Sequence, residues 1–243
     1  MAFSFLLLPL MGNTFFQFKQ FRINQDRCAM KVCTDSCLFG AWIPVKENTL
    51  QILDIGTGTG LLSLIMAQRS HASIDAVEIE EDAFRQASEN FAASKWPNRI
   101  HIFHTDIRQF PAIKKYDLVI CNPPFYENSL PSTEQKEKIA KHHSGLALEN
   151  LLLSIQNLIS EQSKLALLLP FFRKKEINEL LANHGWHVER ETAVKNKQEQ
   201  PYFRYMVCAG RQATEKNSTE IIIYETGKKY TAEFTELLSH LYL

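Results

Sequence analysis

LQILDIGTGTG occupies residues 50–60 of this 243-residue chain, and a regular pattern begins there. The apolar run at 50–55 predicts a buried strand, the glycines predict a tight turn, and LLSLIMAQR at 61–69 predicts a helix. Glycines let a backbone approach a ligand closely, and the N-terminus of the helix that follows favours negative charge. The stretch therefore predicts a ligand-binding strand–turn–helix unit.

The same alternation continues downstream. Further strands are predicted at 74–78, 100–104, 116–121 and 164–169, and helices at 82–94, 146–159 and 172–184. Because alternating strands and helices connect through right-handed crossovers, they predict an α/β fold with a parallel sheet and helices on both faces. Residues 186–194 and 202–209 have antiparallel-strand character, 220–224 is one more strand, and a terminal helix starts at about Thr231.

Before the glycine turn, the spacing of Phe16 and Phe18 indicates a short strand or hairpin arm. Residues 30–42 indicate a polar turn that enters a small helix, with Thr34 or Asp35 as its N-cap.

The chain has no internal repeat and no low-complexity linker, so we expect a single domain at 12–243. It would comprise an N-terminal arm and helix at 12–42, a core at 43–210, and a C-terminal strand and helix at 211–243. The first eleven residues, MAFSFLLLPLM, lack a basic segment and a cleavage site and are too short to span a membrane. We expect residues 1–11 to be a non-essential extension.

Composition narrows the function classes. Lys plus Arg and Asp plus Glu both number 27, so no global basic field indicates a nucleic-acid partner. The five cysteines are odd in number, and the cluster of Cys28, Cys33 and Cys37 lacks the paired spacing of a zinc site. We expect reduced thiols, no metal, a cytoplasmic location, and neither a membrane nor an obligate protein partner.

The glycine turn has the spacing G-x-G-x-G. A dinucleotide fingerprint requires glycine at position 61, which is Leu61 here. Asp54 would repel a pyrophosphate but would suit a ligand that carries an ammonium, with the ligand's carboxylate over the helix N-terminus. Glu78 ends the second strand, where it could bind ribose hydroxyls, and Asp106 follows the third, where it could accept from an adenine amino group. An amino acid, a ribose and an adenine together make S-adenosylmethionine. The alternative interpretation is that the glycines form only a tight turn and that Glu78 and Asp106 are solvated loop residues.

The fourth strand ends in Asn122-Pro123-Pro124-Phe125. Neither proline can continue a strand ladder, because proline lacks a backbone N–H. The stiff turn presents an amide side chain, a backbone carbonyl and an aromatic ring, which suit an amino group on a flat ring. Alone, the motif is equally consistent with a proline-rich turn and a core phenylalanine.

DIGTGTG, VEIE, TDI and NPPF, in this order, resemble the motifs of the class I S-adenosylmethionine-dependent methyltransferases. This resemblance implies a Rossmann-like, seven-stranded, mostly parallel sheet with an antiparallel final hairpin. NPPF after the fourth strand is similar to the signature of enzymes that methylate adenine N6, guanine N2 or the glutamine side-chain amide.

A closer resemblance is to the bacterial tRNA1(Val) (adenine(37)-N6)-methyltransferases. It rests on FQFKQFRINQDRCAMKV (16–32), TDSCLFGAW (34–42), NPPF and the tail LLSHLYL, although that family usually has glycines where Cys33 and Ser36 stand here. It implies methylation of an anticodon-loop adenine of tRNA, with S-adenosylmethionine as cofactor. The implied catalytic residues are Asn122, Pro123, Pro124 and Phe125, and the implied cofactor-binding residues are Lys31, Thr34, Asp35, Asp54, Gly56, Thr57, Gly58, Gly60, Glu78, Ile79, Asp106 and Ile107.

In this interpretation the Asn122 side-chain oxygen and the Pro123 carbonyl accept both N–H bonds of the target amino group, while Phe125 stacks on the base. The alternatives are an rRNA guanine-N2 methyltransferase, a protein glutamine-N5 methyltransferase, and a non-catalytic module that binds S-adenosylmethionine or RNA. Glutamine methyltransferases typically have Tyr at the position of Phe125. The candidate phosphate contacts are Lys195, Lys197, Arg204, Arg211, Lys228 and Lys229.

Overall fold

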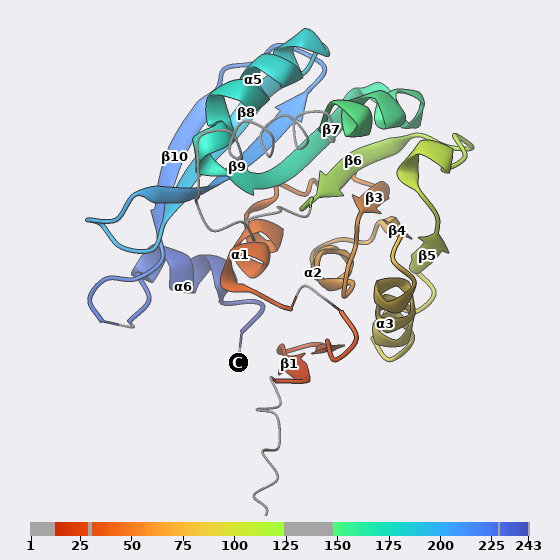
Figure 1. Cartoon of the computed structure of the whole chain (residues 1–243), viewed down its shortest axis with the longest axis horizontal. Coiled ribbons are helices and arrows are strands. Elements are labelled where there is room, and N and C mark those ends of the chain that lie inside the picture. The colour runs from red at the N-terminus through yellow and green to blue at the C-terminus, as the bar shows by residue number, and fades with distance from the viewer. Residues whose placement is uncertain (1–12, 29–30, 124–147, 228, 243) are drawn as a thin grey trace, which may run out of the picture.

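The computed structural model describes residues 13–28, 31–123, 148–227 and 229–242 (Figure 1). Its centre is an eight-stranded sheet with the strand order β10-β8-β9-β7-β6-β3-β4-β5. The strands are β3 (Gln51–Ile55), β4 (Ser73–Glu78), β5 (Ile100–His104), β6 (Tyr116–Cys121), β7 (Ile159–Pro170), β8 (His187–Lys195), β9 (Tyr202–Gly210) and β10 (Asn217–Ile222).

Strand directions follow the predicted topology. Strands β5, β4, β3, β6 and β7 are parallel, and β9 is antiparallel to both of its neighbours, β7 and β8. The predicted strands are all present. The predicted C-terminal strand pairs in parallel with β8, so the seven-stranded sheet implied by the resemblance gains an eighth strand at its edge. Because β9 alone is reversed, all other strands of this sheet end at the same edge.

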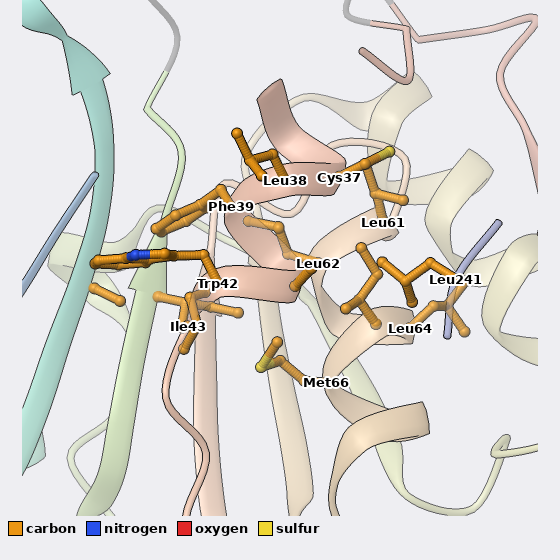
Figure 2. Close-up of a cluster of buried hydrophobic side chains, with 14 of the residues drawn as sticks. Cys37, Leu38, Phe39, Trp42, Ile43, Leu61, Leu62, Leu64, Met66 and Leu241 are labelled. Carbon is orange, nitrogen blue, oxygen red and sulfur yellow. The ribbon is translucent and has the colours of Figure 1, made fainter. Parts of the chain in front are cut away.

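Helices cover both faces. One face carries α1 (Thr34–Trp42), α2 (Leu61–Arg69), α3 (Glu81–Ala92) and α6 (Ala232–Leu238), and the other carries residues 148–155 and α5 (Lys174–Asn183) (Figure 1). Alternate strand residues supply the two cores: Ile52 and Ile120 face the first set of helices, whereas Leu53 and Val119 face the second. This alternation is the period-2 pattern of a strand with two buried faces. Figure 2 shows the α1 side of the core, where Leu38, Phe39 and Trp42 lie near Leu62 of α2.

The predicted N-terminal arm is a two-stranded hairpin of β1 (Phe15–Gln17) and β2 (Arg22–Asn24). Phe18 is buried and stacks on Phe21, with 4.6 Å between the ring centroids. The Asn90 side chain of α3 donates to the carbonyls of Asn24 and Thr59, both at 2.9 Å. The arm is thereby tied to α3 and to the glycine turn.

Several predicted boundaries were wrong by a few residues. The range predicted as one helix at 172–184 begins with a 3₁₀ helix, η3 (Phe171–Arg173), which precedes α5. The range predicted as a helix at 146–159 includes a second 3₁₀ helix, η2 (Gln156–Leu158), and β7 already begins at Ile159. The N-cap of α1 is Cys33, so the prediction of Thr34 or Asp35 as the cap was wrong. The prediction for Thr231 is confirmed, since it caps α6 and its hydroxyl accepts from Phe234 N at 3.2 Å.

Some predictions fall outside the described residues: the extension at 1–11, Pro124, Phe125 and Lys228. Within the part that is described, no helix combines the length and the apolar character needed to cross a bilayer. The cysteines at positions 28, 33, 37, 121 and 208 are all free thiols.

Candidate functional site at the carboxyl edge of the sheet

The glycine turn leaves β3 at the edge where the parallel strands end, and the N-terminus of α2 follows it. Gly56, Gly58 and Gly60 have φ angles of 69°, 59° and 86°, a region that favours glycine. A Cβ atom at Gly60 would come within 2.8 Å of Phe91 Cζ, whereas Cβ atoms at Gly56 and Gly58 would meet nothing within 4 Å. One glycine therefore permits close packing on α3, and the other two leave open space for a ligand.

Asp54 lies beneath this turn and is fully buried. Its Oδ2 accepts from Thr57 Oγ1 at 2.7 Å and from Ser63 Oγ at 2.6 Å. Its Oδ1 has no hydrogen-bond partner within the described residues. Burial raises the pKa of Asp54 to about 6. A buried carboxylate oxygen without a protein partner suits a donor group on a ligand.

Glu78 ends β4 beside the turn and is also buried. Its Oε2 accepts from Gly58 N at 2.8 Å, and its Oε1 accepts from the backbone N–H groups of Ile79 at 2.8 Å and Glu80 at 3.0 Å. A carboxylate has about four acceptor sites and three backbone N–H groups donate to this one, so Glu78 keeps capacity for about one hydroxyl donor. The next residue, Ile79, is 58% exposed. Glu78 and Ile79 thus pair a polar acceptor with an open apolar surface.

Asp106 follows β5 and caps the 3₁₀ helix η1 (Ile107–Gln109), accepting from Arg108 N at 2.9 Å. The Arg108 guanidinium also bonds both carboxylate oxygens, and these hydrogen bonds lower the pKa of Asp106. Ile107 is partly buried against the core. Asp106 lies at the predicted edge with its side chain bonded to Arg108, and its contact with an adenine stays a prediction.

Asn122 directly follows β6 and is partly buried. Its Nδ2 donates to Ser36 Oγ of α1 at 3.0 Å. Pro123 is partly buried next to it. Cys121, the last residue of β6, pairs in register with Ile55, the last residue of β3. The turn at Asn122 and the glycine turn therefore leave adjacent strands at the same register position.

The N-terminal turn of α1 reaches the same edge. Asp35 Oδ1 accepts from Ser36 N at 3.0 Å, and its Oδ2 accepts from Arg204 Nε of β9 at 2.6 Å. Thr34 is partly buried and Lys31 is exposed. Asp35 and Arg204 were predicted to have other roles, and Ser36 was not predicted to contribute to the site. No motif relates these positions, because the contacts join residues 86 and 169 apart in sequence.

Other predicted residues have partners of their own. Lys195 Nζ lies 3.4 Å from Glu220, Lys229 Nζ lies 2.8 Å from Glu225, and Arg211 donates to the His184 carbonyl at 2.7 Å. Contact with phosphate stays a prediction for these residues, as it does for Lys197 and Arg204.

Cys121, in the strand predicted at 116–121, is buried in the core, and burial raises the pKa of its thiol above the ordinary range. Within residues 13–28, 31–123, 148–227 and 229–242, no three His, Cys, Asp or Glu side chains are arranged to hold a metal ion.

The edge as a whole fits S-adenosylmethionine. Its features are the open space over Gly56 and Gly58, the Asp54 Oδ1 atom that lacks a partner in the described part of the chain, the acceptor Glu78 and the exposed Ile79. Their chemistry matches the predicted contacts with a ligand backbone, an ammonium, a ribose hydroxyl and a flat ring, and each of these contacts stays a prediction.

Comparison with known proteins gives matches along nearly the whole chain. Residues 30–152 match the family model "Methyltransferase small domain". A tRNA1(Val) (adenine(37)-N6)-methyltransferase of Cytophaga hutchinsonii is 41% identical over 238 residues, which cover 96% of this chain and 99% of that protein. Proteins of the same name from Dyadobacter fermentans and Proteus mirabilis are 41% and 37% identical, covering 95% and 94% of this chain and 98% and 93% of theirs.

Solved structures agree on the fold. A predicted O-methyltransferase from Agrobacterium tumefaciens superposes with a TM-score of 0.64 at 16% identity, covering 84% of this chain and 95% of that one. Magnesium protoporphyrin IX methyltransferase from Synechocystis, solved with bound S-adenosylmethionine, gives 0.52 at 20% identity, covering 74% and 78%. The architecture is therefore the Rossmann-like methyltransferase fold.

Proposed function

We propose, because this chain belongs to the tRNA1(Val) (adenine(37)-N6)-methyltransferase family, that it methylates the exocyclic N6 of adenine 37 in the anticodon loop of that tRNA. The observation that carries the proposal is the register pairing of Ile55 with Cys121. Because of this pairing, the glycine turn and the turn at Asn122 begin next to each other. A methyl donor bound at the glycine turn would therefore lie close to an amino group bound at the turn at Asn122.

S-adenosylmethionine supplies an electrophilic methyl group at its sulfonium. The chain's own residues bind and orient. We assign Asp54 and the turn from Gly56 to Gly60, with Thr57, to the amino-acid part of the cofactor, Glu78 to the ribose, and Ile79, Asp106 and Ile107 to the adenine. Lys31, Thr34 and Asp35 complete the proposed set. This assignment is supported by Asp54 Oδ1, which has no hydrogen-bond partner among the residues that the structure describes, and by the position of Glu78 beside Gly58.

Asn122 and Pro123 have the role of acceptors for the target amino group. The lone pair of an exocyclic amino nitrogen is delocalised into the ring. Hydrogen bonds from its two N–H groups to Asn122 Oδ1 and to the Pro123 carbonyl would draw that lone pair out of conjugation and hold it in line with the methyl group. Phe125 has the proposed role of stacking on the base, and base stacking on an aromatic side chain is worth about 1–3 kcal/mol. Stacking offsets part of the cost of unstacking a base, which is lowest in an unpaired loop.

We further propose a single methyltransferase domain at 12–243, a dispensable extension at 1–11, action in the cytoplasm, and phosphate contacts from the C-terminal basic residues. The free thiols are consistent with a reducing compartment. The rival activities named from the sequence, on rRNA guanine or on protein glutamine, have no counterpart in the names of the relatives quoted above.

The test uses purified chain, labelled cofactor and total tRNA from cells that lack the protein, followed by nucleoside analysis. Label is expected in N6-methyladenosine of one tRNA. Asn122→Ala is expected to abolish incorporation while cofactor affinity stays within a few-fold, because Asn122 contacts the base in this proposal. The matched control is Asn183→Ala, at the exposed end of α5. Label in guanine or in protein, or full activity of Asn122→Ala, would refute the proposal.

A further inference from the structure

We propose that Ser36 is a positioning residue that orients the Asn122 amide for the methyl-transfer step; this inference rests on the proposed function. An asparagine amide has a donor end, Nδ2, and an acceptor end, Oδ1. Asn122 Nδ2 donates to Ser36 Oγ at 3.0 Å. Among the described residues, Oδ1 of Asn122 has no hydrogen-bond partner. Ser36 therefore holds the donor end and leaves the acceptor end for the substrate.

Ser36 is itself held in place. It is buried in the first turn of α1, its N–H donates to Asp35 Oδ1 at 3.0 Å, and its hydroxyl lies 3.0 Å from Cys33 Sγ. The body of α1 is fixed by its packing, with Leu38, Phe39 and Trp42 fully or almost fully buried in the core shared with α2 (Figure 2). The hydroxyl is thus a fixed point to which a side chain on another element can bond.

A second anchor holds the same turn of α1. Asp35 Oδ2 accepts from Arg204 Nε at 2.6 Å, and the two side chains are 13% and 17% exposed. An ion pair so far removed from water is less screened than a surface pair. Arg204 lies on β9 and Asn122 follows β6, and β7 separates these two strands in the sheet. The first turn of α1 therefore bridges the carboxyl end of β7 and is bonded on both sides of it.

The bond matters because the two ends of an amide have opposite hydrogen-bonding character. The terminal torsion of asparagine is broad and roughly two-fold, so the side chain alone does not select which end faces the substrate. With the Ser36 hydroxyl removed, the NH₂ end can turn toward the target amino group, and two donors would then face each other. Misplacement of a reacting group by 1 Å costs about 100-fold in rate, and a partial loss of orientation is expected to cost about tenfold.

The experiment compares Ser36→Ala with Ser163→Ala in the full chain. Ser163 is a matched control, because it is completely buried and its hydroxyl donates to the Tyr116 carbonyl at 2.6 Å, at the opposite end of β6. For Ser36→Ala, kcat is expected to fall about tenfold, while the Kd for S-adenosylmethionine stays within twofold. For Ser163→Ala, kcat is expected to be unchanged. Ser36→Thr, which keeps the hydroxyl, is expected to recover most of the rate.

A kcat for Ser36→Ala within twofold of wild type would overturn the inference, as would an equal fall in Ser163→Ala or a matching loss of cofactor affinity. Wild-type activity on tRNA is measured first, since its absence refutes the proposed function and not the role of Ser36. A second measurement needs no variant to be active. The NH₂ protons of the Asn122 side chain are observed through the attached ¹⁵N, and their signal is assigned by its absence in Asn122→Ala. In the wild type these protons should exchange slowly with solvent. Exchange at the rate of a free amide would also overturn the inference.

Discussion

Replacing Gly60 with alanine would test how the glycine turn and α3 are held together. Gly60 has a φ of 86°, and a Cβ atom there would come within 2.8 Å of Phe91 Cζ. The left-handed backbone costs a residue with a Cβ atom about 1–2 kcal/mol. Overpacking against a buried ring costs about 1–3 kcal/mol more. Gly60→Ala should therefore lower the free energy of unfolding by about 2–5 kcal/mol, the sum of these two costs.

The matched control is Gly227→Ala. Gly227 also has a positive φ, 62°, but a Cβ atom there would meet nothing within 4 Å. It should cost only the backbone penalty, about 1–2 kcal/mol. Both variants are compared by urea unfolding followed by circular dichroism. The double variant Gly60→Ala/Phe91→Leu should be more stable than the sum of its single changes predicts, by at least about 1 kcal/mol, because the smaller side chain relieves the clash.

Equal costs for the two glycine substitutions would refute this reasoning, since they would mean that the Phe91 ring moves aside without loss. Strict additivity in the double variant would refute it as well.

Three further predictions concern charged residues. Because burial raises the pKa of Asp54 to about 6, cofactor affinity measured by calorimetry should rise with pH through about 6, and Asp54→Asn should remove that dependence; a flat wild-type profile would contradict the role of Asp54. Glu78→Gln should weaken cofactor binding about tenfold, because one charged acceptor is lost, and unchanged affinity would exclude Glu78 from the site. Burial tends to raise the pKa of Glu191, but hydrogen bonds from Lys174, Tyr205 and Ser218 outweigh it and hold the pKa at about 2. Glu191 should then contribute about 3 kcal/mol above its unfolded pKa of 4.5, lost as pH falls toward 2, and Glu191→Gln should flatten that acid-side loss in thermal unfolding.

The order of strands and helices could be predicted from the sequence because the central strands are clear runs of apolar residues. Apart from Asp54, residues 52–55 and 118–121 are apolar on both faces, and glycines mark the turn, so the strands and the edge at which they end follow from local patterns. The C-terminal edge strand was less well placed. Its predicted range of 220–224 followed the apolar run EIIIY, whereas β10 is Asn217–Ile222. Its first four residues are exposed, because an edge strand can gain ladder hydrogen bonds without burying side chains.

The site was predictable only in part. Asp54, Glu78 and Asn122 each stand at a strand end, a position that sequence identifies. The bonds from Ser36 to Asn122 and from Asp35 to Arg204 were not predictable, because they join residues 86 and 169 apart and depend on how α1 docks across the sheet. The partner of Asp106 was also missed. Arg108 lies two residues away, but only the 3₁₀ turn brings its guanidinium onto the carboxylate.

Because Arg204 lies on β9, the shortest fragment expected to be active must include that strand. The family-model match covers residues 30–152, but that segment stops short of β7, which begins at Ile159. Cut there, β6 would become an open strand edge, a template for aggregation, and Asp35 would lose its ion-pair partner. Transplanting this activity, in a gene fusion or a split enzyme, therefore requires the chain at least through Gly210, the end of β9.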